Sequence, residues 1–252
     1  MEARRVDNKS NGGSDISAAL EKMTKGFSPF YKGDTDILRN RSAEIPAEEN
    51  CSLFITGLSP TTTTPQLLGA IRNVGRVYAT HINGPEPDRG HMTCAAKVVF
   101  FERAAAERFY ARFHTGFHIP AHPNHTGRVV WNRIRSAEVD PNGRKSRVLL
   151  ISGPKALVNE TALRAYLSTK IQYQVEAVIP LHHATQRALI EFRFGSYRCQ
   201  AEAARMALAR EFKEYGVFCE FGKSFLSLMK PRQMLTATGR DPCDLESRRQ
   251  FW

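Results

Sequence analysis

The sequence predicts an α+β protein made of two tandem ferredoxin-like domains, each with the element order strand–helix–strand–strand–helix–strand. Three observations support this prediction. Alternating residues mark a half-buried strand at Leu53, and a similar apolar strand recurs at Leu149, 96 residues later. Another pair of matching strands is centred at Val98 and Ile190, 92 residues apart. An alanine-rich helical segment follows each member of this pair, and two copies at nearly one offset indicate tandem domains.

Turn residues divide the first half into its elements. Gly57 and the pair Ser59-Pro60 end the first strand, and Pro65 stands at the start of a segment with apolar residues at helical spacing. The Pro- and Gly-rich run from Asn83 to Gly90 is a loop between the second and third strands. We expect strands at 53–56, 77–82, 93–101 and 128–134, and helices at 65–74 and 104–110.

The second half repeats this order after a strong turn signal, Asp140-Pro141-Asn142-Gly143, and a short basic segment. Asn159 is in position to cap the first helix of this half. We expect strands at 148–152, 175–181, 187–194 and 217–221, and a second helix at 200–212. The predicted organisation is a disordered arm (1–50), a first domain (51–138), a linker (139–145), a second, degenerate domain (146–223) and a tail or insertion (224–252).

The positive charge of the chain lies in the two predicted domains. The 252 residues carry a net charge of +11, to which residues 51–138 and 139–223 contribute +5 each, whereas 1–50 sum to −1 and 224–252 to +2. A basic surface spread over folded domains favours a polyanionic partner, nucleic acid first. The alternative is a basic surface that serves only solubility.

The sequence lacks the motifs of cofactor sites and any arrangement typical of an activated catalytic group, so we expect neither an enzyme nor a cofactor. Five scattered cysteines without a CxxC pair argue against a disulfide framework and indicate a reducing compartment. No apolar run approaches the length of a membrane span, and no signal peptide is visible. We expect an intracellular protein, in the nucleus or the cytoplasm, with no membrane partner.

Four histidines crowd the connection between the second helix and the last strand of the first domain. Their spacing would suit a metal ion on a continuous helix, but Gly116 and Pro120 interrupt the segment. We therefore expect a polar loop and no metal site at His114, His118, His122 and His125.

Two segments of the first domain carry a family resemblance. The runs Leu53-Phe54-Ile55-Thr56-Gly57-Leu58 and Thr93-Cys94-Ala95-Ala96-Lys97-Val98-Val99-Phe100 are similar to the two central-strand motifs of the RNA recognition motif (RRM) family. The resemblance covers roughly residues 50–138 and, more weakly, 146–223, and it implies a sheet whose open face binds single-stranded RNA. The chain departs from the motifs at Gly57, where the family has Asn, and at Ala95 and Lys97, which replace two stacking aromatic residues.

The aromatic residue that remains, Phe54, becomes the main candidate for base stacking, with Lys97 beside it as a phosphate or base-edge contact. Trp131 faces the open sheet if Val130 and Asn132 point inward, and faces the core if it points inward itself. The basic run into the linker either follows the RNA or is simply solvated. The candidate RNA-binding residues are Phe54, Thr56, His81, Ala95, Lys97, Trp131, Arg133, Arg135, Arg144, Lys145, Arg147 and Arg187.

The second copy departs further and places aliphatic residues at the surface positions. Leu150 stands where Phe54 stands in the first copy, and we expect Leu189 and Phe218 on the same open face. Contiguous apolar surface of this kind is typical of a protein contact. The segment Tyr197-Arg198-Cys199-Gln200, with its alanine-rich helix, resembles tandem RRM proteins of fungi.

The sequence thus predicts a protein that binds single-stranded RNA through the open sheet of the first domain and the basic linker, with an auxiliary second domain. Because so few aromatic platforms remain, we expect weak and salt-dependent binding with little sequence preference. The alternative is a protein–protein interaction module in which the RRM-like sheets bind a peptide or each other.

Overall fold

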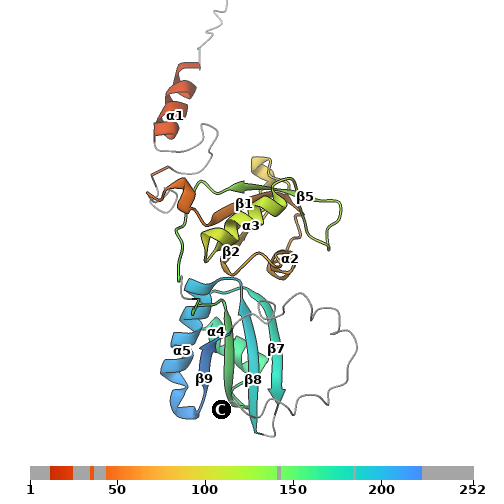
Figure 1. Cartoon of the computed structure of the whole chain (residues 1–252), viewed down its shortest axis with the longest axis vertical. Coiled ribbons are helices and arrows are strands. Elements are labelled where there is room, and N and C mark those ends of the chain that lie inside the picture. The colour runs from red at the N-terminus through yellow and green to blue at the C-terminus, as the bar shows by residue number, and fades with distance from the viewer. Residues whose placement is uncertain (1–11, 25–34, 37–43, 141–142, 184–185, 223–252) are drawn as a thin grey trace, which may run out of the picture.

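The computed structural model describes residues 12–24, 35–36, 44–140, 143–183 and 186–222. Two α+β domains follow one another along the long axis of the molecule (Figure 1). The predicted tail, 224–252, lies outside the described residues.

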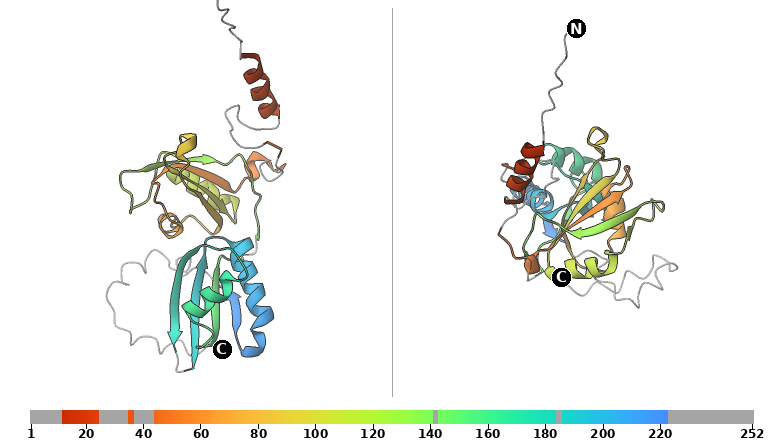
Figure 2. Two further views of the ribbon diagram at one scale, coloured as in Figure 1. Left: turned by 180° about the vertical axis from the view of Figure 1, so that it is seen from behind. Right: turned by 90° about the horizontal axis from the view of Figure 1, so that it is seen from above.

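The first domain is an antiparallel sheet of five strands in the order β2-β3-β1-β5-β4, so the two motif segments form the central strands β1 and β3. Both helices lie on one face of this sheet (Figures 1 and 2). The predicted split βαβ fold is confirmed. Its elements are β1 (Ser52–Leu58), α2 (Thr64–Ala70), β2 (Val77–Asn83), the 3-10 helix η3 (Pro87–Arg89), β3 (Cys94–Phe100), α3 (Arg103–Phe113), β4 (Phe117–His118) and β5 (Thr126–Trp131).

The second domain repeats this architecture with four strands in the order β7-β8-β6-β9. Asn159 caps the first helix by accepting a hydrogen bond from the backbone N–H of Ala162, at 2.8 Å, as the sequence predicts. The elements are β6 (Val148–Pro154), α4 (Glu160–Ser168), β7 (Val175–His183), β8 (Arg187–Phe194), a π-helical turn η4 (Tyr197–Glu202) that leads into α5 (Ala203–Glu211), the 3-10 helix η5 (Lys213–Tyr215) and β9 (Phe218–Phe221).

Alternating burial along the central strands explains why the sequence folds this way. Leu53 and Ile55 are fully buried against the helices, whereas Phe54 between them is half-buried on the opposite face. Leu149 and Ile151 occupy the same positions in the second domain and are also fully buried. Each such side chain stabilises the fold by about 1.5–3 kcal/mol, so the register of the central strands is strongly specified.

Regular structure before Cys51 differs from the expectation. The helix α1 (Gly12–Thr24) and the 3-10 helix η2 (Ala47–Glu49) are present within the segment whose composition indicates a disordered arm. Ile16, Leu20 and Met23 recur in α1 at the spacing that favours a helix, and all three are exposed.

Candidate nucleic-acid interface

A row of side chains crosses the open face of the first domain. The strand register pairs Phe54 with Lys97 and with Val130, and it pairs Lys97 with His81. Side chains paired in this way stand next to one another on one face of a sheet. Phe54 and Lys97 are half-buried and His81 is exposed. The register thus brings Phe54, Lys97 and His81 together on the open face.

A bulge at Gly57 marks the end of this face toward the β1–α2 loop. Gly57 has a φ of 77°, a left-handed conformation that favours glycine, and the register of β1 against β3 shifts here. The glycine that replaces the Asn of the family motif therefore suits the local backbone. The other open-face positions toward this end are Thr56 beside Arg128, and Ala95 beside Asn83.

Lys97 places an ammonium group in the middle of the open face. Burial lowers the pKa of Lys97, because partial loss of hydration disfavours the charged form. Within the described part of the chain, no carboxylate forms an ion pair with it. A bound anion at this position would supply the missing counter-charge, and a phosphate beside Phe54 meets that requirement.

A pair of asparagines closes the other end of the open face. The Asn50 side chain accepts hydrogen bonds from the backbone N–H groups of Ser52 (2.9 Å) and Ser136 (3.2 Å) and donates one to the carbonyl of Asn132 (3.0 Å). Asn132 in turn donates to the Ser52 hydroxyl at 3.1 Å. The chain after β5 is therefore folded back over the start of β1, and the accessible part of the face begins at Phe54.

Trp131 does not belong to the open face. It pairs with Leu53, whose side chain lies in the core, and its ring centroid is 5.2 Å from that of Tyr110 and 4.1 Å from the guanidinium carbon of Arg103, both on α3. The prediction of Trp131 as an RNA contact on the open sheet is therefore wrong. The physical reason is Asn132, whose amide finds hydrogen-bond partners on the open side that an apolar core does not provide.

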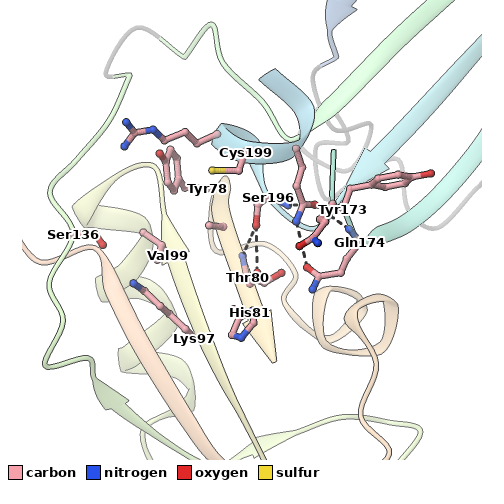
Figure 3. A pocket seen from close by; sticks show the side chains of 14 residues that line it. Tyr78, Thr80, His81, Lys97, Val99, Ser136, Tyr173, Gln174, Ser196 and Cys199 are labelled. Atoms are coloured by element: carbon pink, nitrogen blue, oxygen red, sulfur yellow. Dashed lines mark hydrogen bonds between the residues drawn. The ribbon is translucent and has the colours of Figure 1, made fainter. Parts of the chain in front are cut away.

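The edge strand β2 of the first domain is covered by the second domain. The Thr80 backbone N–H donates to the Gly195 carbonyl (3.2 Å) and the Ser196 hydroxyl (3.3 Å), and the Thr80 hydroxyl donates to the same carbonyl at 2.9 Å. The Ser196 hydroxyl donates to the Thr80 carbonyl at 3.2 Å (Figure 3). Each such bond stabilises the docked arrangement by about 0.5–1.5 kcal/mol, and together they occupy an edge that would otherwise be open to another strand.

Aromatic rings fill the space where the domains meet. The ring centroids of Tyr78 and Phe101, from the first domain, are 5.2 Å apart, and that of Tyr197 lies 5.7 and 5.5 Å from them. Phe221 of β9 lies 5.5 Å from Tyr197. Phe101 is fully buried and Tyr197 is 2% exposed, and burial raises the pKa of Tyr197 above its usual range. The two domains are thus packed directly against each other.

The linker is bound to the first domain through Arg76. Its guanidinium pairs with Glu102 (2.8 Å) and Asp140 (3.1 Å) and donates to the carbonyl of Lys145 at 2.9 Å. Burial opposes ionisation of Asp140, but hydrogen bonds from the Lys145 N–H and from Arg76 outweigh it and lower the pKa of Asp140. The alternative of a simply solvated linker is therefore wrong for Asp140 and for the backbone of Lys145.

A cleft of about 570 Å³ between the domains continues the open face, and we call it the front cleft. Figure 3 shows Lys97 and His81 along one wall and Ser196 and Cys199 across from them. The second domain contributes the turn η4, and π-helical turns are frequent at functional sites. Gln200 of this turn accepts hydrogen bonds from the N–H groups of Gln174 and Ser196, both at 3.2 Å, and fixes the far wall.

One predicted linker contact is engaged in holding the second domain together. Arg147 forms an ion pair with Glu176 and donates to the carbonyl of Phe194. Its side chain is 13% exposed and that of Glu176 is 7% exposed. An RNA contact through Arg147 stays a prediction; it would require breaking this ion pair, which would leave a buried carboxylate unpaired.

The other predicted basic contacts also lie away from the open face. Arg133 and Arg135 line a cavity with Trp131, and Arg135 donates to the Ile45 carbonyl at 2.6 Å. Arg187 lies at the end of the second domain remote from the linker. The remaining two, Arg144 and Lys145, line a separate cleft behind the aromatic rings.

The open face of the second domain is more mixed than predicted. The register places Leu150 beside Glu191, and Leu189 and Phe218 on either side of one β6 residue, so the three predicted apolar residues share this face. Phe218 is 57% exposed. Glu191 pairs with Arg193 on the same face. The domains meet through the β2 edge and not through their open faces, so the alternative in which the two sheets bind each other is wrong.

The surface at which the two domains pack together, formed by Tyr78, Phe101 and Tyr197, is called the docking surface. It was not predicted from the sequence, although the sequence contains one signal for it. Phe101 directly follows Phe100, whose side chain fills the core of the first domain, so a second consecutive aromatic residue had no place in that core. Tyr78 similarly follows the core residue Val77. An aromatic residue that directly follows a core residue at a strand end points away from the core, and it indicates a surface that another part of the protein covers.

The described residues contain neither a candidate metal cluster nor a candidate membrane span. There, no group of three or more His, Cys, Asp or Glu side chains could hold a metal ion. His122 of the histidine-rich connection instead lies 3.1 Å from the Gln66 side-chain oxygen. No helix in the described ranges combines the length and apolar character needed to cross a bilayer.

The strand order and helix placement make the chain a tandem arrangement of two ferredoxin-like βαββαβ domains. Several solved structures are similar to it. RNA recognition domains 1 and 2 of Sex-lethal from Drosophila melanogaster share 16% identity, with a TM-score of 0.25, over 69% of this chain and 100% of that chain. The first two RRM domains of the yeast poly(U)-binding protein Pub1 share 15% identity, with a TM-score of 0.28, over 68% and 99%. The RNA-binding domain of Hrp1 in complex with RNA shares 16% identity, with a TM-score of 0.25, over 69% and 98%.

No protein-family model matches the chain, and no curated protein matches it. The predicted resemblance to fungal tandem RRM proteins stays a prediction.

Proposed function

We propose that this protein binds single-stranded RNA, with one base on Phe54 and the strand continuing into the front cleft. The observation that carries this proposal is the half-buried, unpaired ammonium of Lys97 beside an accessible aromatic ring, at the entrance to a cleft between docked domains. A nucleotide offers both groups that this pair accepts, a flat base for the ring and a phosphate for the cation.

The neighbouring residues extend this site in two directions. Val130 continues the apolar surface beside Phe54, and Arg128 is exposed on the same face. In the other direction, Arg198 is exposed at the front cleft, where it adds a second positive charge across from Lys97. The second domain therefore contributes charge and a fixed wall, as an auxiliary to the first.

Binding is expected to be weak and sensitive to salt. Only one base rests on an aromatic ring, and each such stack contributes about 1–3 kcal/mol. Two to three phosphate contacts, at a salt slope of about −0.7 each, lower the affinity about tenfold between 50 and 200 mM salt. Fluorescence anisotropy with a labelled eight-nucleotide RNA at these two salt concentrations measures this change.

A duplex of the same length is the matched control, because its bases are stacked on one another and cannot lie on Phe54. Equal binding of the duplex, or affinity that does not change with salt, would contradict the proposal.

A second candidate function is a protein contact through the open face of the second domain. It is favoured by the exposure of Phe218 next to Leu150 and Leu189. Absence of RNA binding even at 50 mM salt would favour this function over the first.

A further inference from the structure

A second cleft, of about 520 Å³, lies behind the docking surface, and we call it the rear cleft. It shares no lining residue with the front cleft. Tyr78 lines the front cleft and Phe101 lines the rear one, and their ring centroids are 5.2 Å apart. The aromatic rings between the domains therefore separate two sites that a ligand can occupy independently.

The rear cleft is strongly basic. It is lined by five cationic side chains, drawn from the turn after α2, the start of β2, the linker and the start of β6, and by one carboxylate, that of Glu176. Two of these cations are neutralised: Arg76 by Glu102 and Asp140, and Arg147 by Glu176. The three that remain are Arg72, Arg144 and Lys145.

None of these three cations has an ion-pair partner among the described residues. Arg72 donates only its Nε–H, to the Gly69 carbonyl at 2.7 Å. Arg144 is exposed, and the Lys145 ammonium lies 5.7 Å from the centroid of the Tyr197 ring. Three cationic residues without an ion-pair partner in the described part of the chain thus line one hollow.

The linker backbone that carries Arg144 and Lys145 is fixed by hydrogen bonds. Asp140 accepts hydrogen bonds from Arg76 and from the Lys145 N–H, and Gly143 takes a left-handed φ of 69° that lets the chain turn between them. Because this backbone is already ordered, only the side chains of Arg144 and Lys145 lose conformational entropy on binding an anion.

We infer that the rear cleft binds phosphate groups. Guanidinium groups pair with two phosphate oxygens at once, and an ammonium adds a third charge-assisted hydrogen bond. The shared chemistry fits two sources, the backbone of a nucleic acid strand that passes around the linker or a free polyphosphate. The inference rests on the proposed function only for the first source, because anion binding here does not require the front cleft.

The test compares the variant Arg144→Gln/Lys145→Gln with the matched control Lys155→Gln/Lys213→Gln. Both variants lose two positive charges, but Lys155 and Lys213 are exposed at the opposite end of the second domain. Among the described residues, the side chains of the test pair make no fold contact other than that of Lys145 with the Tyr197 ring, so both variants should fold. Circular dichroism and the thermal unfolding midpoint check this.

Three probes are used: tripolyphosphate, a four-nucleotide single-stranded RNA and a sixteen-nucleotide one. We expect the test variant to lose thermal stabilisation by tripolyphosphate. We expect it to bind the long RNA at least about tenfold more weakly, with a salt slope reduced by about 1.4, while the short RNA is unaffected. The control variant should keep both the thermal stabilisation by tripolyphosphate and the affinity for the long RNA.

The other outcomes also decide whether the rear cleft binds phosphate groups and from which source. Loss of tripolyphosphate binding with unchanged long-RNA binding supports a free polyphosphate as the ligand. If the test variant responds to tripolyphosphate and to the long RNA as the wild type does, the inference is overturned. Binding of the four-nucleotide RNA by the Arg144→Gln/Lys145→Gln variant reports on the front site, so failure of the proposed function is seen separately.

Discussion

Replacing Phe54 with alanine is expected to weaken binding of an eight-nucleotide single-stranded RNA roughly 5- to 150-fold, the equivalent of about 1–3 kcal/mol for one stacked base. The reason is that Phe54 is the aromatic ring of the motif strands that the register places on the open face, beside the unpaired Lys97. Lys97→Gln should lower the salt slope by about 0.7, the contribution of one phosphate contact. Fluorescence anisotropy over a salt series measures both effects.

The matched control is Tyr215→Ala/Lys213→Gln, which also removes one aromatic ring and one cation. Tyr215 is 65% exposed and Lys213 is exposed, and both belong to η5 in the second domain, away from the front cleft. This variant should bind RNA like the wild type. Equal losses in the control, or undiminished binding by Phe54→Ala, would show that RNA does not use the open face.

Replacing Tyr197 with alanine should separate the two domains. Truncating a buried aromatic ring costs about 3–5 kcal/mol, and this ring contacts Tyr78 and Phe101 across the docking surface and Phe221 within its own domain. The backbone N–H of Thr80, which donates to Gly195, should then exchange with solvent faster by two orders of magnitude or more. Hydrogen exchange measured by NMR detects this change residue by residue.

Two further variants test whether loss of the Tyr197 ring itself causes the faster exchange of the Thr80 amide. Tyr197→Phe keeps the ring and loses only the hydroxyl, which donates to Glu202 at 2.6 Å, so the Thr80 amide should stay protected. Tyr166→Ala truncates a ring packed on Phe212 inside the second domain and should destabilise that domain without exposing Thr80. Unchanged protection of Thr80 in Tyr197→Ala would contradict the docked arrangement.

Much of the fold could be predicted because its determinants are local. The alternation of Leu53 with Phe54, and its repetition at Leu149, fixes which face of each sheet is buried. The α1 helix could not be predicted from the composition of the arm. The orientation of Trp131 could not be decided either, since it depends on the hydrogen bond that the Asn132 side chain donates to the Ser52 hydroxyl, 80 residues earlier in the sequence.

The candidate site could be predicted only in its motif half. Phe54 and Lys97 could be predicted because they stand at fixed positions of a recognisable strand pattern. The front cleft could not be predicted, because it depends on the contact between Thr80 and Ser196, 116 residues later. The linker arginines were assigned to RNA because an ion pair such as that between Arg147 and Glu176 leaves no local trace in the sequence.

Chemical-shift mapping by NMR, with a four-nucleotide single-stranded RNA and the isotope-labelled full chain, locates the bound strand directly. We predict that the largest amide shifts fall around Phe54 and Lys97 and extend to Ser196 and Gln200 across the front cleft. Shifts confined to the open face of the second domain around Phe218, or no shifts at low salt, would show that RNA does not bind across the first domain and the front cleft.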